Sequence, residues 1–124
     1  MCGIFGIAVA PGPNRQGTAE IESLIRMLFV LSETRGTEAS GIAAALDGDS
    51  RLLKAPVTAS KFVVGDEYRH FIAGVLRDWP PADATTGAAV IGDSRLVTNG
   101  LQTLPAKNQP VTAGEVAVVH NGIV

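Results

Sequence analysis

A cysteine directly follows the initiator methionine, and this position gives Cys2 a chemistry that most cysteines lack. Removal of Met1 would leave the thiol and a free α-amino group on one residue. Reference pKa values are roughly 7.7 to 8.0 for such an amine and about 8.5 for a thiol, so near neutral pH part of the amine can accept the thiol proton. Cys2 would then be a nucleophile that carries its own base.

The simpler interpretation of Cys2 alone is a small buried hydrophobic residue behind a retained Met1, whose presence would make the Cys2 nitrogen a non-basic amide. The flanking residues suit catalysis. Gly3 would allow close approach of a substrate to the backbone, and the apolar Ile4 and Phe5 would anchor the strand that holds the thiol. Other segments must therefore decide between the two interpretations.

The residues after Cys2 predict the elements that position it. Gly3 to Ala10 are apolar and rich in Ile, Val and small residues, and turn-forming residues at 11–14 follow, which predicts a buried strand. From Thr18, taken as the N-cap, apolar residues recur at the spacing of one helical face, so we expect a helix of about four turns. That face comprises Ile21, Leu24, Ile25, Leu28 and Leu31.

The middle of the chain predicts a hairpin followed by helical structure. Ser40 to Leu46 indicates a second strand, residues 47–50 a turn, and Arg51 to Lys54 the partner strand. The mixed spacing from Ser60 to Arg77, interrupted near Gly65, predicts one broken helix or two short ones.

The last third predicts two inner strands, Ala88 to Gly92 and Val116 to His120, because both runs are short and rich in β-branched residues. Trp79, beside two prolines, is expected to anchor a loop in the core. The expected class is α+β, because strands outnumber helices and the first connection leads from a strand through a helix to a hairpin.

Composition excludes several classes of protein. With 124 residues, 46% hydrophobic residues and a net charge of -2, the chain fits one soluble globular domain. No run of like charges indicates nucleic acid or an anionic membrane as a partner. One cysteine forms no intrachain disulfide, and no Cys/His cluster has zinc spacing, so no metal or cofactor is expected. The start lacks a basic leader or long apolar stretch, which favours the cytoplasm over export or membrane anchoring.

Four segments match one known family in order and spacing: Met1–Ile7, Arg35–Gly41, Ser94–Gly100 and His120–Ile123. They resemble, in turn, the opening, the Arg-Gly-x-Asp block, the glutamine-binding loop and the oxyanion segment of class II glutamine amidotransferases. These are N-terminal-nucleophile hydrolases that supply ammonia to partner synthase domains. Four matched blocks across nearly the whole chain are far more specific than any one motif.

The resemblance implies a four-layer αββα N-terminal-nucleophile hydrolase sandwich, of which residues 1–124 would form the amino-terminal portion of a glutamine amidotransferase type 2 domain. It implies attack of Cys2 on the side-chain amide of glutamine, release of ammonia, a glutamyl thioester and hydrolysis to glutamate. The implied partner is a synthase or acceptor domain or subunit that uses the ammonia. The oligomeric state stays open, a homo-oligomer included.

The resemblance assigns glutamine binding to Arg95 and the loop after it. The planar guanidinium of Arg95 can hold the α-carboxylate of glutamine with two parallel hydrogen bonds. Without the neighbouring match, Arg95 would be a surface arginine and the loop a simple turn. The implied substrate-binding residues are Arg95, Leu96, Val97, Thr98, Asn99 and Gly100.

The resemblance assigns the oxyanion hole to the side-chain amide of Asn121 and the backbone N–H of Gly122. Local chemistry alone would favour an Asn-Gly turn closing a hairpin. His120 is expected inside a strand, without a catalytic role. Arg35 and Gly36 resemble a block that lines the active site and supports the strand of the nucleophile, although a cation at a helix C-terminus is a simpler account of Arg35.

The glutamine-binding segment departs from the sugar-amidotransferase pattern His-Thr-Arg-Trp-Ala-Thr-His-Gly. The first His, the Trp, the Ala and the second His are replaced by Asp93, Leu96, Val97 and Asn99. The Arg95-Leu96 pair and Asn108-Gln109-Pro110 are closer to asparagine synthetases, whereas His120–Ile123 is closer to the glucosamine-6-phosphate synthase type. The acceptor of the ammonia therefore stays open.

The chain stops at Val124, directly after a strand-like run, so we expect it to be incomplete at its C-terminus and, alone, poorly active or inactive. In the family an Asp beyond the Asn-Gly segment binds the amino group of the substrate, and no residue here matches it. Two alternatives stay open. One is a non-catalytic remnant that serves in assembly or glutamine binding, and the other is an N-terminal-nucleophile amidohydrolase that acts on a different amide.

Overall fold

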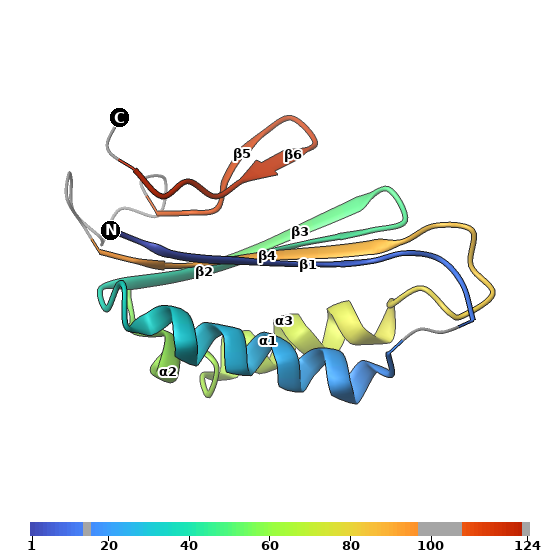
Figure 1. Cartoon of the computed structure of the whole chain (residues 1–124), viewed down its shortest axis with the longest axis horizontal. Helices are drawn as coiled ribbons and strands as arrows, with labels where there is room; N and C mark the ends of the chain where they lie inside the picture. The colour runs from blue at the N-terminus through green and yellow to red at the C-terminus, as the bar shows by residue number, and fades with distance from the viewer. Residues whose placement is uncertain (14–15, 97–107, 123–124) are drawn as a thin grey trace.

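The computed structural model describes residues 1–13, 16–96 and 108–122, and within them helices cover one face of an antiparallel sheet (Figure 1). The sheet has four strands in the order β1-β4-β2-β3, and a hairpin of β5 and β6 lies over its opposite face. The elements are β1 Gly3–Val9, α1 Thr18–Glu33, β2 Ala39–Leu46, β3 Asp49–Ala55, α2 Ala59–Phe62, α3 Asp66–Arg77, β4 Ala88–Arg95, β5 Val111–Ala113 and β6 Val116–Val118. The α+β class is confirmed, while the four-layer αββα sandwich stays a prediction.

Strand β1 is a half-buried edge strand, not the buried strand that its composition predicted. Its odd-numbered residues turn toward the helices, where the ring of Phe5 packs edge-on against Phe29 with centroids 4.8 Å apart. Its even-numbered residues from Ile4 to Ala8 are exposed on the other face. Strand β1 lies at the edge of the sheet, because among the described strands it pairs only with β4.

Helix α1 buries Ile21, Ile25 and Phe29 against the sheet, which confirms the helix and most of its expected apolar face. Leu31 is an exception, because 60% of it is exposed. The N-cap was predicted one residue late. The N–H of Ile21 donates to the carbonyl of Gly17 at 3.1 Å, so Gly17 is the cap and Thr18 is the first helical residue.

The predicted hairpin is confirmed as β2 and β3, with a tighter turn than expected. Asp47 and Gly48 have positive φ angles of 44° and 80°, which matches the two-residue turn that joins twisted antiparallel strands. Residues 49 and 50 therefore belong to β3. Strand β2 pairs with both β3 and β4, and nearly all of its residues are buried.

The predicted break at Gly65 is confirmed, because α2 and α3 are separate helices. Helix α3 buries Tyr68, Ile72 and Val75, and Phe62 of α2 packs beside Tyr68 with ring centroids 5.4 Å apart. Trp79, only 8% exposed, follows α3 and belongs to the same core, as predicted.

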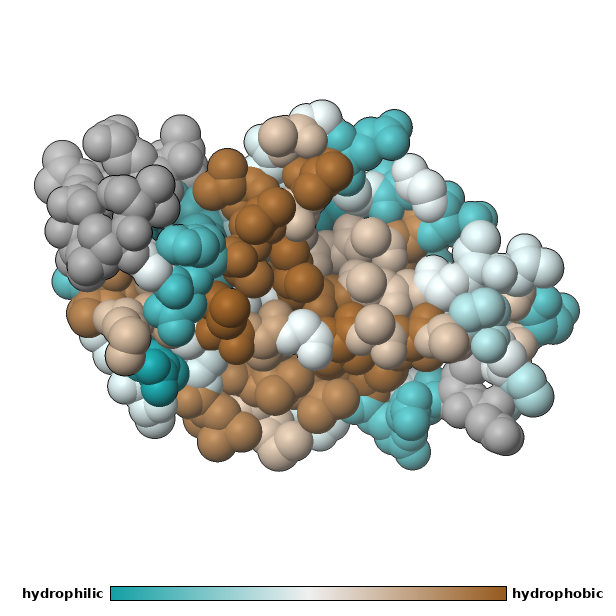
Figure 2. Space-filling view, turned by 45° about the horizontal axis from the view of Figure 1, so that its top comes forward, coloured by the Kyte–Doolittle hydropathy of each residue, from teal (hydrophilic) through white to brown (hydrophobic). Residues whose placement is uncertain are grey.

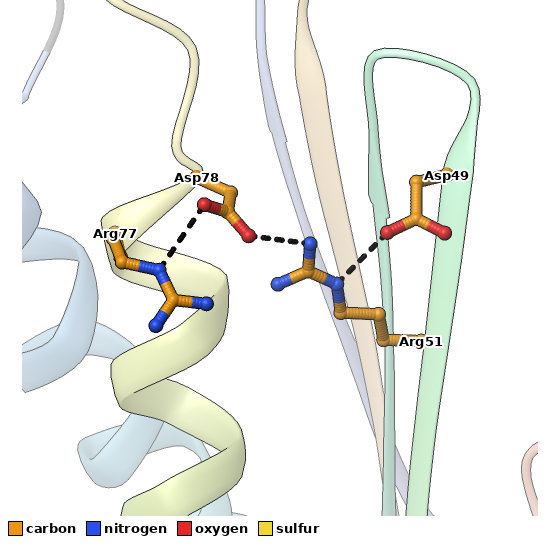
Figure 3. A network of polar contacts seen from close by, with 4 residues as sticks. All are labelled: Asp49, Arg51, Arg77 and Asp78. Atoms are coloured by element: carbon orange, nitrogen blue, oxygen red, sulfur yellow. Dashed lines mark hydrogen bonds and ion pairs between the residues drawn. The ribbon is translucent and has the colours of Figure 1, made fainter.

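An ion-pair network joins the sheet to the end of α3 (Figure 3). Arg51 in β3 lies 2.9 Å from a carboxylate oxygen of Asp49 and 2.6 Å from one of Asp78, which also contacts Arg77. The hydrogen bond from Arg51, and then that from Arg77, lowers the pKa of Asp78. Because these side chains are partly exposed, the network fixes geometry more than it adds stability.

The predicted inner strand Val116 to His120 is wrong in length and position. Strand β6 is short and mostly exposed, and it pairs with β5, a strand that we did not predict. The β-branched residues that indicated a core strand lie instead in a surface hairpin that turns at Gly114, which has a φ of 59°. Figure 2 shows hydrophobic residues gathered across the middle of the molecule on this side. The exposed large hydrophobic residues in these strands include Ile4, Leu52, Val111, Val116 and Val118.

Candidate functional site

Cys2, Asp93 and Arg95 share one end and one face of the sheet. The hydroxyl of Ser94 lies 2.6 Å from that of Ser32 in α1, so Ser94 points toward the helices and its neighbours Asp93 and Arg95 point away from them. Gly3 pairs with Ser94, and one step further along this register Cys2 lies beside Arg95. The predicted nucleophile and the predicted carboxylate-binding residue therefore meet at the face opposite the helices.

Cys2 is joined to Asn121 by a hydrogen bond. The Cys2 N–H donates to Oδ1 of Asn121 at 3.1 Å, across 119 positions of sequence, and Cys2 is 9% exposed. The same side-chain amide also carries a donor, Nδ2. The two residues that the sequence assigned to attack and to oxyanion stabilisation are thus neighbours.

The structure gives a reason for glycine at position 3 that differs from the predicted one. A Cβ at this position would lie 2.3 Å from the carbonyl oxygen of Ser32, so glycine is needed for β1 to approach α1. Gly3 faces the helices, which is the side away from Asp93 and Arg95. It therefore positions Cys2 and does not offer backbone to a substrate.

Gln109 fixes the segment that carries Asn121, and sequence reasoning assigned it no role. Its Nε2 donates to the carbonyl of His120 at 2.7 Å, and its Oε1 accepts from the His120 N–H. The Gln109 backbone lies directly on the sheet at Gly41, where a Cβ would come within 1.9 Å of the Gln109 carbonyl oxygen. His120 is exposed and lies outside any strand, which corrects its predicted place.

Arg95 and Lys54 both bind Asn108. Nη1 of Arg95 donates to the side-chain Oδ1 of Asn108 at 3.0 Å. Nζ of Lys54 donates to the backbone carbonyl oxygen of Asn108 at 2.8 Å. Asn108 is 2% exposed, and desolvation lowers the pKa of Lys54. Two cationic side chains therefore converge on one buried residue, and no sequence pattern had indicated this.

Gly36 packs against the strand that carries Arg95. A Cβ on Gly36 would lie 2.3 Å from the Ser94 carbonyl oxygen, so only glycine allows the chain after α1 to come this close to β4. The N–H of Glu38 donates to the carbonyl of Arg95 at 3.0 Å. Arg35 is exposed, and its Nη2 lies 4.0 Å from Sδ of Met1.

Asp93 is a buried carboxyl group that sequence reasoning had noted only as a departure from the family pattern. It is 1% exposed, and within the described residues neither carboxyl oxygen has a hydrogen-bond partner. Burial raises the pKa of Asp93 to about 7 from its ordinary value of 3.8, while the charge of Arg95 opposes the shift.

The remaining predicted residues are less informative. Gly122 is exposed, and a Cβ there would lie 2.6 Å from the His120 ring. Leu96 is 41% exposed, and Val97, Thr98, Asn99 and Gly100 lie outside the described residues. A cavity of about 140 Å³ under the β5–β6 hairpin is lined by none of the predicted site residues that the structure describes.

The described residues contain neither a metal-ligand cluster nor a membrane-spanning helix. No group of three or more His, Cys, Asp or Glu side chains could hold a metal ion there. No helix in that part of the chain has the length and apolar character needed to cross a membrane.

The chain is similar to a glutamine--fructose-6-phosphate aminotransferase (isomerizing) of Caulobacter vibrioides, with 34% identity over 126 aligned positions. The alignment covers all of this chain and 17% of that protein, so the chain spans about a sixth of its relative. No family model matches the chain, and no solved structure matches it significantly.

Proposed function

We propose that this chain carries the glutaminase site of a class II glutamine amidotransferase, with Cys2 as its amino-terminal nucleophile. The observation that carries the proposal is the hydrogen bond between the Cys2 nitrogen and Oδ1 of Asn121. The similarity to glutamine--fructose-6-phosphate aminotransferase supports the use of glutamine. The four-layer sandwich and the type 2 domain over residues 1–124 are parts of the same proposal.

The reaction begins when Met1 is removed and the Cys2 nitrogen becomes an amine. The unprotonated amine accepts the thiol proton, and the thiolate attacks the side-chain carbonyl carbon of glutamine. The contact with Asn121 remains available to the amine, because an amine also donates to an amide oxygen. This contact would hold the amine and the thiol in one orientation.

The oxyanion that forms on the substrate is stabilised by Nδ2 of Asn121 and the backbone N–H of Gly122. Such donors act because they already point to the place where negative charge develops. Gln109 contributes by holding the backbone of His120, the residue before this pair. Collapse of the intermediate breaks the carbon–nitrogen bond, and the leaving nitrogen takes the proton from the α-ammonium group of Cys2.

The glutamyl thioester that remains is hydrolysed by water, with the Cys2 amine as the base, and glutamate leaves. Arg95 selects an α-amino acid over a simple amide by pairing with the α-carboxylate. Its anchoring on Asn108, 3.0 Å away, limits the positions that the guanidinium can take. Leu96 and residues 97–100 complete the substrate loop in this proposal, and Arg35 and Gly36 support β4 and the chain start.

The released ammonia is the substrate of a synthase or acceptor domain or subunit. The relative is about six times as long as the aligned segment, so a partner region fused to the glutaminase site is compatible with the comparison. The resemblance implies a cytoplasmic enzyme.

The test is ammonia and glutamate release by the intact protein, compared with Cys2→Ala. We expect wild-type turnover of glutamine and a loss on the order of 10³-fold or more in the variant. Glutaminamide, which lacks the α-carboxylate, is the matched substrate control and should be a poor substrate. Retention of Met1 with no turnover would favour the assembly or binding module, and equal turnover of both amides would favour another amidohydrolase.

A further inference from the structure

Asp93 is a buried acid that the proposed reaction leaves without a task. It is 1% exposed, and neither of its oxygens has a hydrogen-bond partner among the described residues. A buried polar group without a partner destabilises a protein by about 1–3 kcal/mol, and more when it is charged. Such a group in a native structure calls for a physical explanation.

The strands beside Asp93 offer it no polar side chain. Ile4 of β1 and Gly41 of β2 are its direct neighbours in the sheet. The backbone of Gln109 lies over Gly41 and helps to bury this position. Burial at this position disfavours the ionised form of Asp93.

Three titratable or charged groups face this region from the described elements around Asp93. Arg95 lies on the same strand, Cys2 immediately precedes β1, and Lys54 lies beyond Gly41 on β3. The Lys54 ammonium donates to the carbonyl of Asn108. The charge of Arg95 lowers the pKa of Asp93 and so opposes the larger effect of burial.

Arg95 is close enough to respond to Asp93. The two residues are two positions apart on one strand, so their side chains leave the same face about 7 Å apart along the strand. A guanidinium on its long stem can span that distance. In this structure the guanidinium donates to Oδ1 of Asn108 at 3.0 Å. Asn108 and the carboxyl group of Asp93 are therefore two alternative partners for the Arg95 guanidinium.

We propose that Asp93 is a positioning residue for Arg95. When Asp93 is uncharged, the guanidinium stays at Asn108 and its positive charge is available to a substrate carboxylate. When Asp93 is ionised, it draws the guanidinium back along β4 and compensates its charge. The choice of glutamine as ligand rests on the proposed function, whereas the coupling between Asp93 and Arg95 does not.

The change falls near neutral pH, because burial raises the pKa of Asp93 to about 7. As pH rises through this value, Asp93 ionises and the affinity of the site for a carboxylate falls. Linkage requires the reciprocal effect: a carboxylate bound at Arg95 disfavours a second negative charge beside it and raises the pKa of Asp93. Binding near neutral pH should therefore take up a proton.

The binding experiment uses the intact protein carrying Cys2→Ala, which prevents turnover, and measures the Kd for glutamine by calorimetry. We expect the Kd to rise about tenfold between about pH 6 and about pH 8. Asp93→Asn in this background should keep the tight low-pH affinity at every pH. Asp83→Asn changes an exposed aspartate that precedes β4, and in this background it should retain the loss of glutamine affinity as pH rises.

A second readout follows the side chains without ligand. In NMR titrations, the carboxyl carbon of Asp93 and Nε of Arg95 should shift with one common midpoint near pH 7, and the Arg95 shift should vanish in Asp93→Asn. Separate midpoints would overturn the coupling. So would a Kd that does not change with pH, or Asp93→Asn binding glutamine more weakly at every pH. A common midpoint without glutamine binding at any pH would overturn the proposed function and leave the coupling intact.

Discussion

The backbone nitrogen of Cys2 lies 3.1 Å from Oδ1 of Asn121, although 119 positions separate them in the sequence. The side-chain amide of Asn121 thus contacts Cys2 through its oxygen, Oδ1, and its nitrogen, Nδ2, remains as a donor. If the oxygen orients the nucleophile and the nitrogen stabilises the oxyanion, the two roles can be separated by changing only one end of that side chain.

Asn121→Asp makes this separation. The carboxylate keeps an acceptor for the Cys2 nitrogen but replaces the Nδ2 donor with an oxygen that repels an oxyanion. We expect kcat to fall by about 10²–10³-fold, which corresponds to about 2.7–4 kcal/mol, with little change in Tm. Asn121→Ala removes both ends and should be at least as slow. Full glutaminase activity in Asn121→Asp would exclude the amide nitrogen from the oxyanion hole.

Gln109→Ala removes both hydrogen bonds to the backbone of His120. Because each such bond contributes about 0.5–1.5 kcal/mol, the local stability of the segment should fall by about 1–3 kcal/mol. Hydrogen exchange of the His120 amide should become faster, and kcat should decrease. Gln16→Ala, at an exposed residue, is the control. Unchanged exchange at His120 would show that other contacts hold the segment.

Gly41→Ala tests whether the Gln109 backbone lies directly on the sheet. The new Cβ would come within 1.9 Å of the Gln109 carbonyl oxygen, so the segment must move, and we expect a loss of about 1–3 kcal/mol or more. Gly6→Ala is matched in sheet and face, but its Cβ meets only ordinary contacts at 3.7 Å. It should be neutral or slightly stabilising. Urea unfolding measures the stability of both variants. Equal stabilities would contradict the close packing of the Gln109 backbone on Gly41.

Asp93→Asn should change the pH dependence of stability. The pKa of Asp93 is about 7 when folded and 3.8 ordinarily, so between these values the folded chain binds more protons and stability falls as pH rises. The penalty is absent below the lower value and complete above the higher one, with an upper bound on the order of 4 kcal/mol. The variant should therefore be more stable than wild type at about pH 8 and similar at about pH 4, by urea unfolding.

Asp83→Asn is again the control for that stability measurement, because Asp83 is exposed. Its difference from wild type should not vary between the two pH values. A gain in Asp93→Asn that is equal at both values would mean that the carboxyl charge is not the cause.

Tyr68→Phe tests a second buried group. The Tyr68 hydroxyl has no hydrogen-bond partner among the described residues, and burial raises its pKa to about 12. The ring of Tyr68 packs against Phe29 and Phe62, so we expect the ring and not the hydroxyl to stabilise the fold. Loss of the hydroxyl should therefore change the free energy of unfolding by less than about 1 kcal/mol. Tyr68→Ala should lose about 3–5 kcal/mol. A large loss in Tyr68→Phe would reveal a partner for the hydroxyl.

Local patterns in the sequence predicted much of the fold. The three-and-four spacing from Ile21 and the break at Gly65 are properties of neighbouring residues, and the helix and the break are both confirmed, although Leu31 of the predicted apolar face is exposed. The exposure of β1 and the hairpin of β5 and β6 were not predicted, because the order of strands and the surface that covers them depend on contacts between distant residues. A short valine-rich run has the same sequence pattern in a core strand and in an exposed hairpin.

The site divides in the same way. The types and positions of Cys2, Asn121 and Arg95 were accessible from the sequence, and their proximity was an expectation of the family resemblance. The hydrogen bonds of Gln109 to the His120 backbone and the burial of Asp93 could not be predicted from the sequence. They depend on a backbone crossing at Gly41 and on register in the sheet, and neither leaves a local pattern.

The most direct test of the central claim is an intact mass spectrum and peptide map of the protein after treatment with a diazoketone analogue of glutamine. The proposed site predicts loss of Met1 and one adduct on the thiol of Cys2, prevented by excess glutamine and absent in Asn121→Ala on the same time scale. A chain that retains Met1, or that stays unlabelled at Cys2 while it binds glutamine, would contradict the account.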